Sequence, residues 1–133
     1  YYGTPKDFVY DKLNQGISVI LEIEIQGALK VKERHPEAVL IFVTPPTVEE
    51  LEARLRGRGT ETEDVILSRL ARAAEEVEYM NKYDYIVLNE NGKIAECAEM
   101  IHRIIESENR KTVYGGELIE SLREGLAAYK KGE

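Results

Sequence analysis

Arginine carries the positive charge in the middle of the chain. Between Lys32 and Lys82 the cationic side chains are Arg34, Arg54, Arg56, Arg58, Arg69 and Arg72. A guanidinium group is planar and donates paired hydrogen bonds to a phosphate, which an ammonium group cannot do. Solvated helix faces with weak Glu–Arg pairs would give the same pattern. The residues alone therefore leave phosphate binding and simple solvation both open.

The spacing of these arginines predicts two helices joined by a hinge. Arg54 and Arg58 lie one helical turn apart, and Arg58 stands in Gly57-Arg58-Gly59-Thr60, where two helical patterns break. Arg69 and Arg72 share one face of the following helix. Because glycine permits unusual backbone angles, the break can act as a mobile hinge.

Two acidic residues also point to a site. Glu22 and Glu24 lie in residues 18–25, a run rich in β-branched residues between Gly16 and Gly27 that predicts a strand. Alternate side chains share a strand face, so these carboxylates are expected roughly 7 Å apart. Two acids on a buried strand are costly unless a cation or hydrogen-bond donor meets them. This favours a ligand-binding role over an edge strand with one wet face.

The remaining candidates give weaker signals. The hydroxyls of Tyr2 and Thr4 could both donate to a phosphate or a base, although Thr4 could equally cap a helix. His35 and His102 have no partner at metal-ligand spacing, so no metal site is predicted from them. Cys97 lies among apolar helix positions and is expected to be a buried small hydrophobe.

The elements that must position these residues alternate between strands and helices. Strands are predicted at residues 18–25, 39–43 and 85–88, and helices at 5–15, 27–34, from 47 onward, 63–81, 93–106 and 117–130. This alternation predicts an α/β fold: a parallel sheet with flanking helices and right-handed crossovers. Ligands bind beyond the carboxyl ends of such strands, which directs attention to residues 22–26, 44–47 and 89–92.

Composition narrows the function classes. The 133 residues suit about one domain, and the net charge of −7 argues against broad nucleic-acid binding. No apolar run approaches the ~18 residues that cross a bilayer, so no membrane association is expected. One cysteine and no recognisable secretory leader suggest a cytoplasmic location. Position 1 is not Met, which suggests processing or a piece of a longer chain.

Several motifs, in order and spacing, resemble the guanylate kinase family. The resemblance covers residues 1 to about 106, and it rests on Tyr1-Tyr2-Gly3-Thr4-Pro5, Leu21-Glu22-Ile23-Glu24-Ile25-Gln26-Gly27-Ala28, Pro45-Pro46 with Glu49-Glu50-Leu51, Arg54-Leu55 to Arg58-Gly59-Thr60-Glu61, Arg69-Leu70, and Tyr83-Asp84-Tyr85-Ile86-Val87-Leu88-Asn89. It implies a partial P-loop nucleoside monophosphate kinase fold with a helical lid. The implied reaction transfers the γ-phosphoryl group of ATP to GMP, with Mg²⁺, in purine nucleotide metabolism.

The resemblance also implies residue roles. Tyr2 would bind the GMP phosphate, Thr4 would contact guanine, and Glu22 and Glu24 would lie on the GMP and magnesium side, with no protein residue expected as a metal ligand. The lid would run from residue 54 to 72. Its phosphate-binding arginines would be Arg54, Arg58 and Arg69, with Arg58 and Arg69 catalytic, and Asn89 would lie near adenine. The family more often has Asp where Glu24 stands, which puts guanine selectivity in doubt.

The same resemblance implies how the chain divides into regions. Residues 1–106 would be the family portion: 1–17 ends the GMP-binding region, 18–46 is core, 47–82 is the lid and long helix, and 83–106 is the last core strand and helix. Residues 107–133 match nothing assignable and are expected to form an added amphipathic helix.

One family motif is absent from the sequence. Gly-x-x-x-x-Gly-Lys-Ser/Thr, the cradle for the β- and γ-phosphates, occurs nowhere in the 133 residues. In the family it precedes the Tyr-Tyr-Gly motif, so we expect a C-terminal portion that is inactive alone. The strand at 18–25 would then have an exposed edge, which invites self-association or pairing with the missing N-terminal portion.

Two other functions fit parts of the pattern. A non-catalytic guanylate-kinase-like module that binds peptides can dispense with the cradle, but it has no need of lid arginines. A plain α/β domain with solvated arginines would show no change in melting temperature with GMP or ATP, since a ligand stabilises only what it binds.

Overall fold

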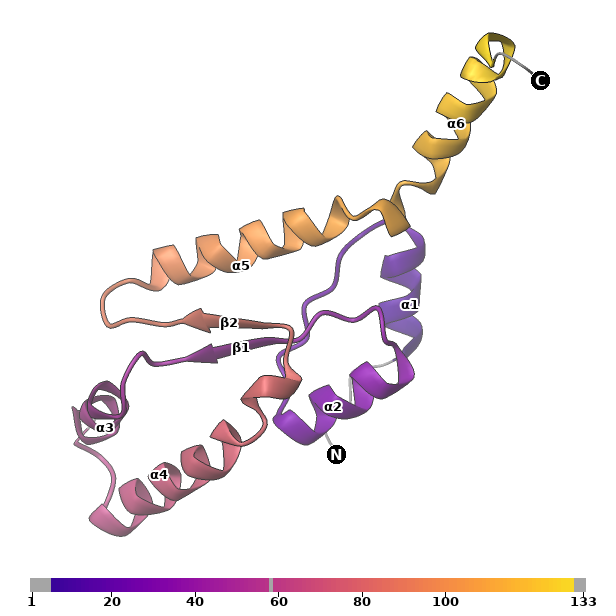
Figure 1. Ribbon diagram of the computed structural model, residues 1–133. Coiled ribbons are helices and arrows are strands. Elements are labelled where there is room, and N and C mark those ends of the chain that lie inside the picture. The colour runs from indigo at the N-terminus through magenta and orange to yellow at the C-terminus, as the bar shows by residue number, and fades with distance from the viewer. Residues whose placement is uncertain (1–5, 58, 131–133) are drawn as a thin grey trace.

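The computed structural model describes residues 6–57 and 59–130. Its sheet consists of two parallel strands, β1 (Ile41–Thr44) and β2 (Tyr85–Leu88), paired from Ile41 with Tyr85 to Thr44 with Leu88 (Figure 1). Both strands come from short continuous apolar runs, which suit a strand that is covered on both faces. The expected α/β class with a parallel sheet is confirmed.

Helices make up most of the described chain. Each predicted helix is present, with ends that differ by a few residues: α1 (Lys6–Asn14), α2 (Ile25–Arg34), α3 (Val48–Gly57), α4 (Glu63–Val77), α5 (Ile94–Asn109) and α6 (Gly116–Leu126). Three short 3₁₀ turns follow helices or join elements: Met80–Lys82, Thr112–Tyr114 and Ala127–Tyr129. Helices therefore follow the amphipathic pattern closely.

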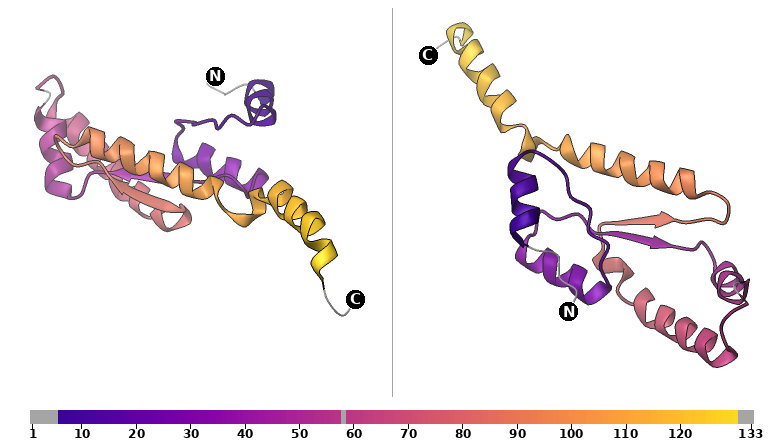
Figure 2. Two further views of the ribbon diagram at one scale, coloured as in Figure 1. Left: turned by 90° about the horizontal axis from the view of Figure 1, so that it is seen from above. Right: turned by 180° about the vertical axis from the view of Figure 1, so that it is seen from behind.

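The core lies between β2 and α5, which runs alongside it (Figures 1 and 2). Val87, Cys97 and Ile104 are buried there, and Ile41, Tyr85 and Ile101 pack against them. The prediction that Cys97 is a buried hydrophobe is confirmed. α3 lies beyond the carboxyl ends of the strands and packs against α4, which runs back toward the start of β2 (Figure 1). We call these two helices with their connection the α3–α4 hairpin.

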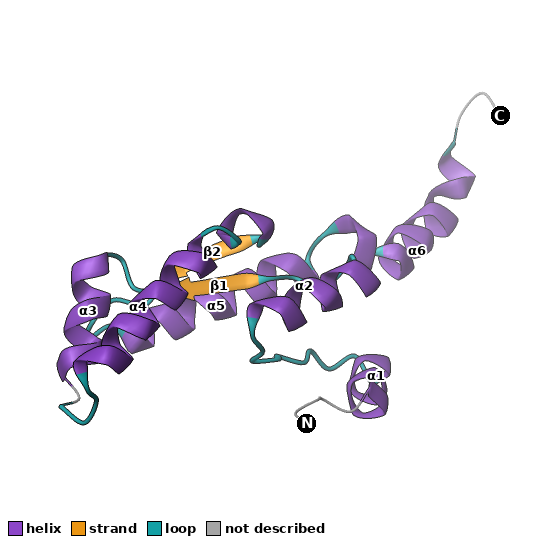
Figure 3. Cartoon of the chain, turned by 90° about the horizontal axis from the view of Figure 1, so that it is seen from below, coloured by secondary structure: helices purple, strands orange, loops and turns teal. Residues whose placement is uncertain are grey.

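The predicted strand at residues 18–25 is wrong. Residues 17–24 form an extended loop between α1 and α2, and Ile25 is already the first residue of α2 (Figure 3). A strand needs a neighbour to satisfy its backbone groups, and no described segment pairs with this one. Apolar composition alone therefore does not make this segment a strand.

One side of the molecule is an open apolar hollow of about 1640 Å³. The loop at 17–24, β1, α4 and α5 all contribute to its lining. Several large apolar side chains remain exposed along it, among them Ile20, Val43, Ile86 and Leu88. A surface of this kind usually marks an interaction site.

The helix α6 extends away from the rest of the described chain (Figures 1 and 2). Its predicted apolar face is present, but Leu118, Leu122, Leu126 and the following Tyr129 are all exposed. Across residues 6–57 and 59–130, no helix combines the length and the apolar character needed to cross a bilayer.

Candidate functional site

Two of the predicted site residues meet beyond the carboxyl ends of the strands. Nη2 of Arg54, on α3, donates to Oε1 of Glu50 at 3.0 Å and also to the backbone carbonyl of Asn89, which follows β2. The same Glu50 oxygen accepts a hydrogen bond from the backbone N–H of Asn91. We call Glu50, Arg54, Asn89 and Asn91 the strand-end clasp. Its position is the one expected for ligand binding in a parallel sheet.

Local structure explains why the clasp forms here. The Asn89 N–H donates to the Thr44 carbonyl at 2.8 Å, which extends the sheet by one bond and fixes the start of the β2–α5 loop. Thr47 caps α3, because its hydroxyl accepts from the Glu50 N–H at 3.1 Å. The Glu50 carboxylate does not complete the capping box and instead reaches the loop.

Burial distinguishes Arg54 from Arg69. The side chains of Arg54 and Glu50 are 29% and 25% exposed, whereas that of Arg69 is 47% exposed. Arg54 forms its hydrogen bonds through Nη2. Within the described part of the chain, its Nε and Nη1 have no hydrogen-bond partner. These remaining N–H groups on a half-buried guanidinium can donate to water or to an anion.

Arg69 projects from α4 and forms an ion pair with Glu61 at 3.0 Å. The Glu61 side chain is more buried than its partner, and its second oxygen, Oε2, is buried without a hydrogen bond among the described residues. Arg72 lies on the same helix and is exposed. Arg58 lies outside the described residues, but Gly59 beside it has φ of +67°, which places the predicted hinge in a glycine conformation.

Arg56 has a structural role. It forms two hydrogen bonds with Glu63, at 2.5 and 2.9 Å, and an ion pair with Glu52 at 3.5 Å. The hydrogen bonds to Glu63 raise the pKa of Arg56, and the same contact lowers the pKa of Glu63. This arginine therefore ties α3 to the start of α4.

The expectation that Glu22 and Glu24 share a strand face at the ligand end is wrong. Glu24 is the N-cap of α2: its carboxylate accepts from the N–H groups of Gln26 at 3.0 Å and Gly27 at 2.6 Å. A capping carboxylate satisfies donors that the helix start leaves unpaired. Glu24 also lies close enough to Tyr83 to help raise the pKa of that phenol, after the larger effects of burial and Glu76.

The fold consequently does not bring Glu22 and Glu24 together with the arginine of the strand-end clasp. Tyr83 precedes β2, so Glu24 lies toward the amino ends of the strands, and α2 lies away from α3 in Figures 1 and 2. Glu22 is exposed in the loop before α2. Tyr2 and Thr4 lie outside the described residues.

Sequence reasoning missed Glu50 and Asn91. In the sequence Glu50 enters only through the motif Glu49-Glu50-Leu51, although it stands four residues before Arg54, the spacing of a helical ion pair. Its contact with Asn91 joins positions 41 residues apart and has no local signal.

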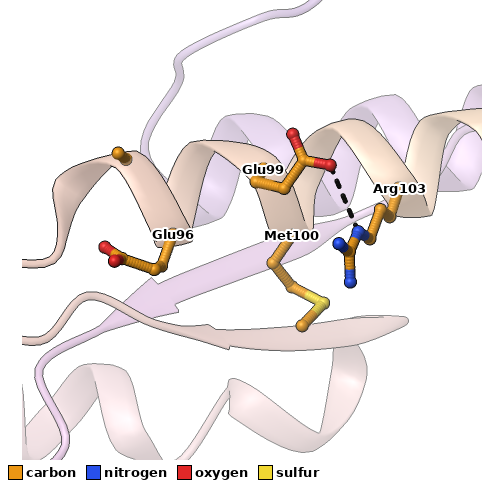
Figure 4. A pocket seen from close by; sticks show the side chains of 5 residues that line it. Glu96, Glu99, Met100 and Arg103 are labelled. Carbon is orange, nitrogen blue, oxygen red and sulfur yellow. Dashed lines mark hydrogen bonds and ion pairs between the residues drawn. The ribbon is translucent and has the colours of Figure 1, made fainter.

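A second, shallow hollow lies on the outer face of α5 (Figure 4). It is lined by Ala95, Glu96, Glu99, Met100 and Arg103, all from one helix. Nε of Arg103 donates a hydrogen bond to Oε1 of Glu99 at 3.2 Å. No second element contributes a polar group, so we do not consider it a functional site. Among the described residues, no three His, Cys, Asp or Glu side chains gather as metal ligands.

Comparison with known proteins identifies the family. The family model described as guanylate kinase matches residues 1–108. The chain belongs to the guanylate kinase family. The motif-based resemblance, which extended to about residue 106, is thereby confirmed.

Curated relatives support the guanylate kinase assignment. The chain is 52% identical over 109 residues to a guanylate kinase of Streptococcus thermophilus, strain CNRZ 1066, a match that covers 82% of this chain and 51% of the relative. A guanylate kinase of Streptococcus pyogenes serotype M3, strain MGAS315, is 51% identical over the same shares of both chains. The chain spans about half the length of the curated relatives it matches.

Proposed function

We propose that this chain acts in guanylate kinase catalysis, the transfer of the γ-phosphoryl group of ATP to GMP that yields ADP and GDP. The observation that carries the proposal is the strand-end clasp, where Arg54 is held beside Asn89 and its Nε and Nη1 have no hydrogen-bond partner among the described residues. The family assignment supplies the reaction, because the curated relatives are named guanylate kinase.

The proposed chemistry relies on alignment and charge. A phosphate oxygen of GMP forms the new bond to the γ-phosphorus, while the bond to the oxygen bridging to the β-phosphate breaks. Negative charge spreads over the phosphoryl oxygens, and guanidinium groups stabilise it. We assign Arg54, Arg58 and Arg69 to the phosphates, with Arg58 and Arg69 closest to the transferred group, and Asn89 to the adenine side.

The α3–α4 hairpin is proposed to be the lid. Arg69 is more than two-fifths exposed in its pair with Glu61. Exposed pairs are worth little, so a nucleotide phosphate can compete for this arginine. Gly59, with its left-handed backbone, lies where such a lid would bend. Closure would bring cations in and exclude water.

The GMP side is proposed to involve Tyr2, Thr4, Glu22 and Glu24. Glu24 already accepts two backbone hydrogen bonds, so its role there would combine with capping α2. The Glu22 carboxylate has no hydrogen-bond partner within the described residues, which leaves it available to a ligand.

Magnesium is proposed to arrive with ATP. Mg²⁺ keeps several waters and binds substrate phosphates with one or two carboxylates, so it needs no dedicated cluster of protein ligands. When bound, the ion neutralises developing charge on the β- and γ-oxygens.

The open hollow is proposed to receive further protein. Exposed Val43, Ile86 and Leu88 on the sheet suit the part of the family sequence that this chain does not match, or a second copy of the chain. The phosphate cradle motif is absent from the 133 residues, so we expect the chain alone to be inactive. We place the protein in the cytoplasm because its single cysteine suits a reducing compartment.

A coupled steady-state assay with ATP, GMP and Mg²⁺ tests the activity. We expect no turnover by the chain alone, and turnover once the N-terminal part of a curated relative is supplied. Turnover near that of an intact enzyme without any addition would contradict the need for the cradle.

Ligand titration separates the proposed function from its alternatives. We expect ADP and GMP to raise the melting temperature. Binding of a phosphopeptide without either nucleotide would indicate an interaction module, and no response to any of them would indicate solvated arginines without a site.

A further inference from the structure

Glu50 binds two parts of the strand-end clasp through a single carboxylate oxygen. Its Oε1 accepts from the Arg54 side chain at 3.0 Å and from the Asn91 backbone N–H. Arg54 in turn donates to the Asn89 carbonyl. The contacts join α3 to the loop between β2 and α5, and the two segments are 35 to 41 residues apart in the chain.

These contacts restrict both partners. Arg54 would otherwise sample many rotamers, and a long side chain loses considerable entropy when it binds a ligand. Holding one guanidinium nitrogen in place leaves Nε and Nη1 directed by the planar geometry of the group. Gly92, with φ of +75°, gives the loop a tight turn immediately after Asn91. The same acid therefore sets the orientation of an anion-binding cation and of the loop beside it.

We propose that Glu50 is a positioning residue that couples the lid helix α3 to the β2–α5 loop and so aligns Arg54 and Asn89 on one adenine nucleotide. The proposal rests on the proposed function for the identity of that ligand. The coupling itself is a property of the chain without ligand. Glu50 does not contact the reacting atoms and acts only through Arg54 and the loop.

Other charged groups nearby do not replace it. In the β2–α5 loop, Lys93 pairs with Glu90 at 3.2 Å, within the loop itself. Glu49 is adjacent on α3 and exposed, and among the described residues it makes no ion pair within 4 Å. Glu49→Ala is therefore the matched control, because it removes the same charge from the same helical turn without touching the clasp.

The first test needs no ligand. Amide hydrogen exchange by NMR on the full chain reports the Asn91 N–H, and the Arg54 Nε–H signal reports the side chain. In Glu50→Ala we expect Asn91 to exchange about tenfold faster, the loss typical of a hydrogen bond to a charged group. The Arg54 signal should broaden or move to the position of exposed arginines, while Glu49→Ala leaves both unchanged. Wild-type behaviour of Asn91 and Arg54 in Glu50→Ala would overturn the proposal.

The second test uses ADP and GMP as separate probes in calorimetric titrations. Glu50→Ala should weaken ADP binding about tenfold and change GMP binding less than twofold. Glu50→Gln should recover part of the loss, because its amide oxygen can accept both hydrogen bonds. Equal losses for both nucleotides, or unchanged ADP binding, would overturn the positioning role.

Failure of the proposed function has a different signature. If the wild-type chain binds neither ADP nor a non-hydrolysable ATP analogue, alone or with the N-terminal part of a curated relative supplied, the nucleotide assignment fails. The coupling by Glu50 is then decided by the exchange of Asn91 and the Arg54 signal alone. Should Glu50→Ala prove unfolded, Glu50→Gln takes its place in the exchange measurement, where neutralising the acceptor should still speed Asn91 exchange severalfold.

Discussion

Arg54 donates from one guanidinium nitrogen both to Glu50 on its own helix and to the backbone carbonyl of Asn89, 35 residues further along the chain. This joins the root of the α3–α4 hairpin to the end of β2. It also distinguishes Arg54 from Arg56, two positions later. The three nitrogens of the Arg56 guanidinium contact Glu63 and Glu52, and these contacts connect α3 to α4.

Replacing Arg54 with lysine should weaken nucleotide binding without unfolding the chain. An ammonium group cannot contact the loop and a phosphate in the same planar arrangement, so Arg54→Lys is expected to reduce ADP affinity roughly tenfold. Isothermal titration calorimetry measures the change. Arg103→Lys, in an exposed pair on the outer face of α5, is the control and should have no effect. Equal affinity in the two variants would contradict a role for Arg54 at the phosphates.

The core between β2 and α5 should dominate stability. Ile104 is 8% exposed and Ile94, on the same helix, is 77% exposed. Ile104→Ala is expected to lower the free energy of unfolding by about 2–4 kcal/mol, because it removes buried methyl groups and leaves a cavity. Ile94→Ala should change it by less than about 0.5 kcal/mol. Urea denaturation followed by circular dichroism compares the two, and similar losses would mean that α5 does not pack as described.

The hinge glycine should respond to substitution with the opposite sign from a helical glycine. Gly59 has φ of +67°, a conformation that costs an L-residue roughly 1 kcal/mol, so Gly59→Ala should lower thermal stability. Gly125 lies in α6 with open space around its Cα, and Gly125→Ala should favour that helix by about 0.5–1 kcal/mol. Melting curves followed by helical circular dichroism measure both. A stabilising Gly59→Ala would show that the left-handed turn is not required.

Acid should destabilise the C-terminal end of α5. Lys111 and Tyr85 donate to the Glu108 carboxylate, at 2.8 and 2.5 Å, and these hydrogen bonds lower its pKa from the ordinary value of 4.5. A carboxyl whose pKa is lower in the folded state contributes stability above the unfolded pKa, and that contribution is lost as pH falls through the folded value. We therefore expect the melting temperature to drop as pH falls below about 4.5.

Glu108→Gln isolates this contribution. The variant should be less stable than wild type at pH 7, and its melting temperature should depend less on pH in the acid range. The pKa of Glu63 is also lowered, by Arg56, so some acid sensitivity should remain. An identical pH profile for wild type and variant would show that Glu108 does not link titration to folding.

Much of the fold followed from local chemistry. The apolar runs at 39–43 and 85–88 became β1 and β2, and the helix expected from residue 47 onward became α3, because these preferences act over a few residues. The motifs and their spacing are also sufficient to indicate the guanylate kinase family. Periodicity placed Cys97 correctly in the core.

Tertiary structure decided the points that depend on distant neighbours. Residues 18–25 had the composition of a strand, but a strand requires a paired edge, and Glu24 instead found nearby N–H groups at the start of α2. Sequence alone could not separate Arg54 from Arg56, since both have glutamates at helical spacing. Folding brings Asn89 and Asn91 to Glu50 and Arg54. That long-range contact joins Arg54 to the β2–α5 loop, whereas Arg56 joins α3 to the start of α4.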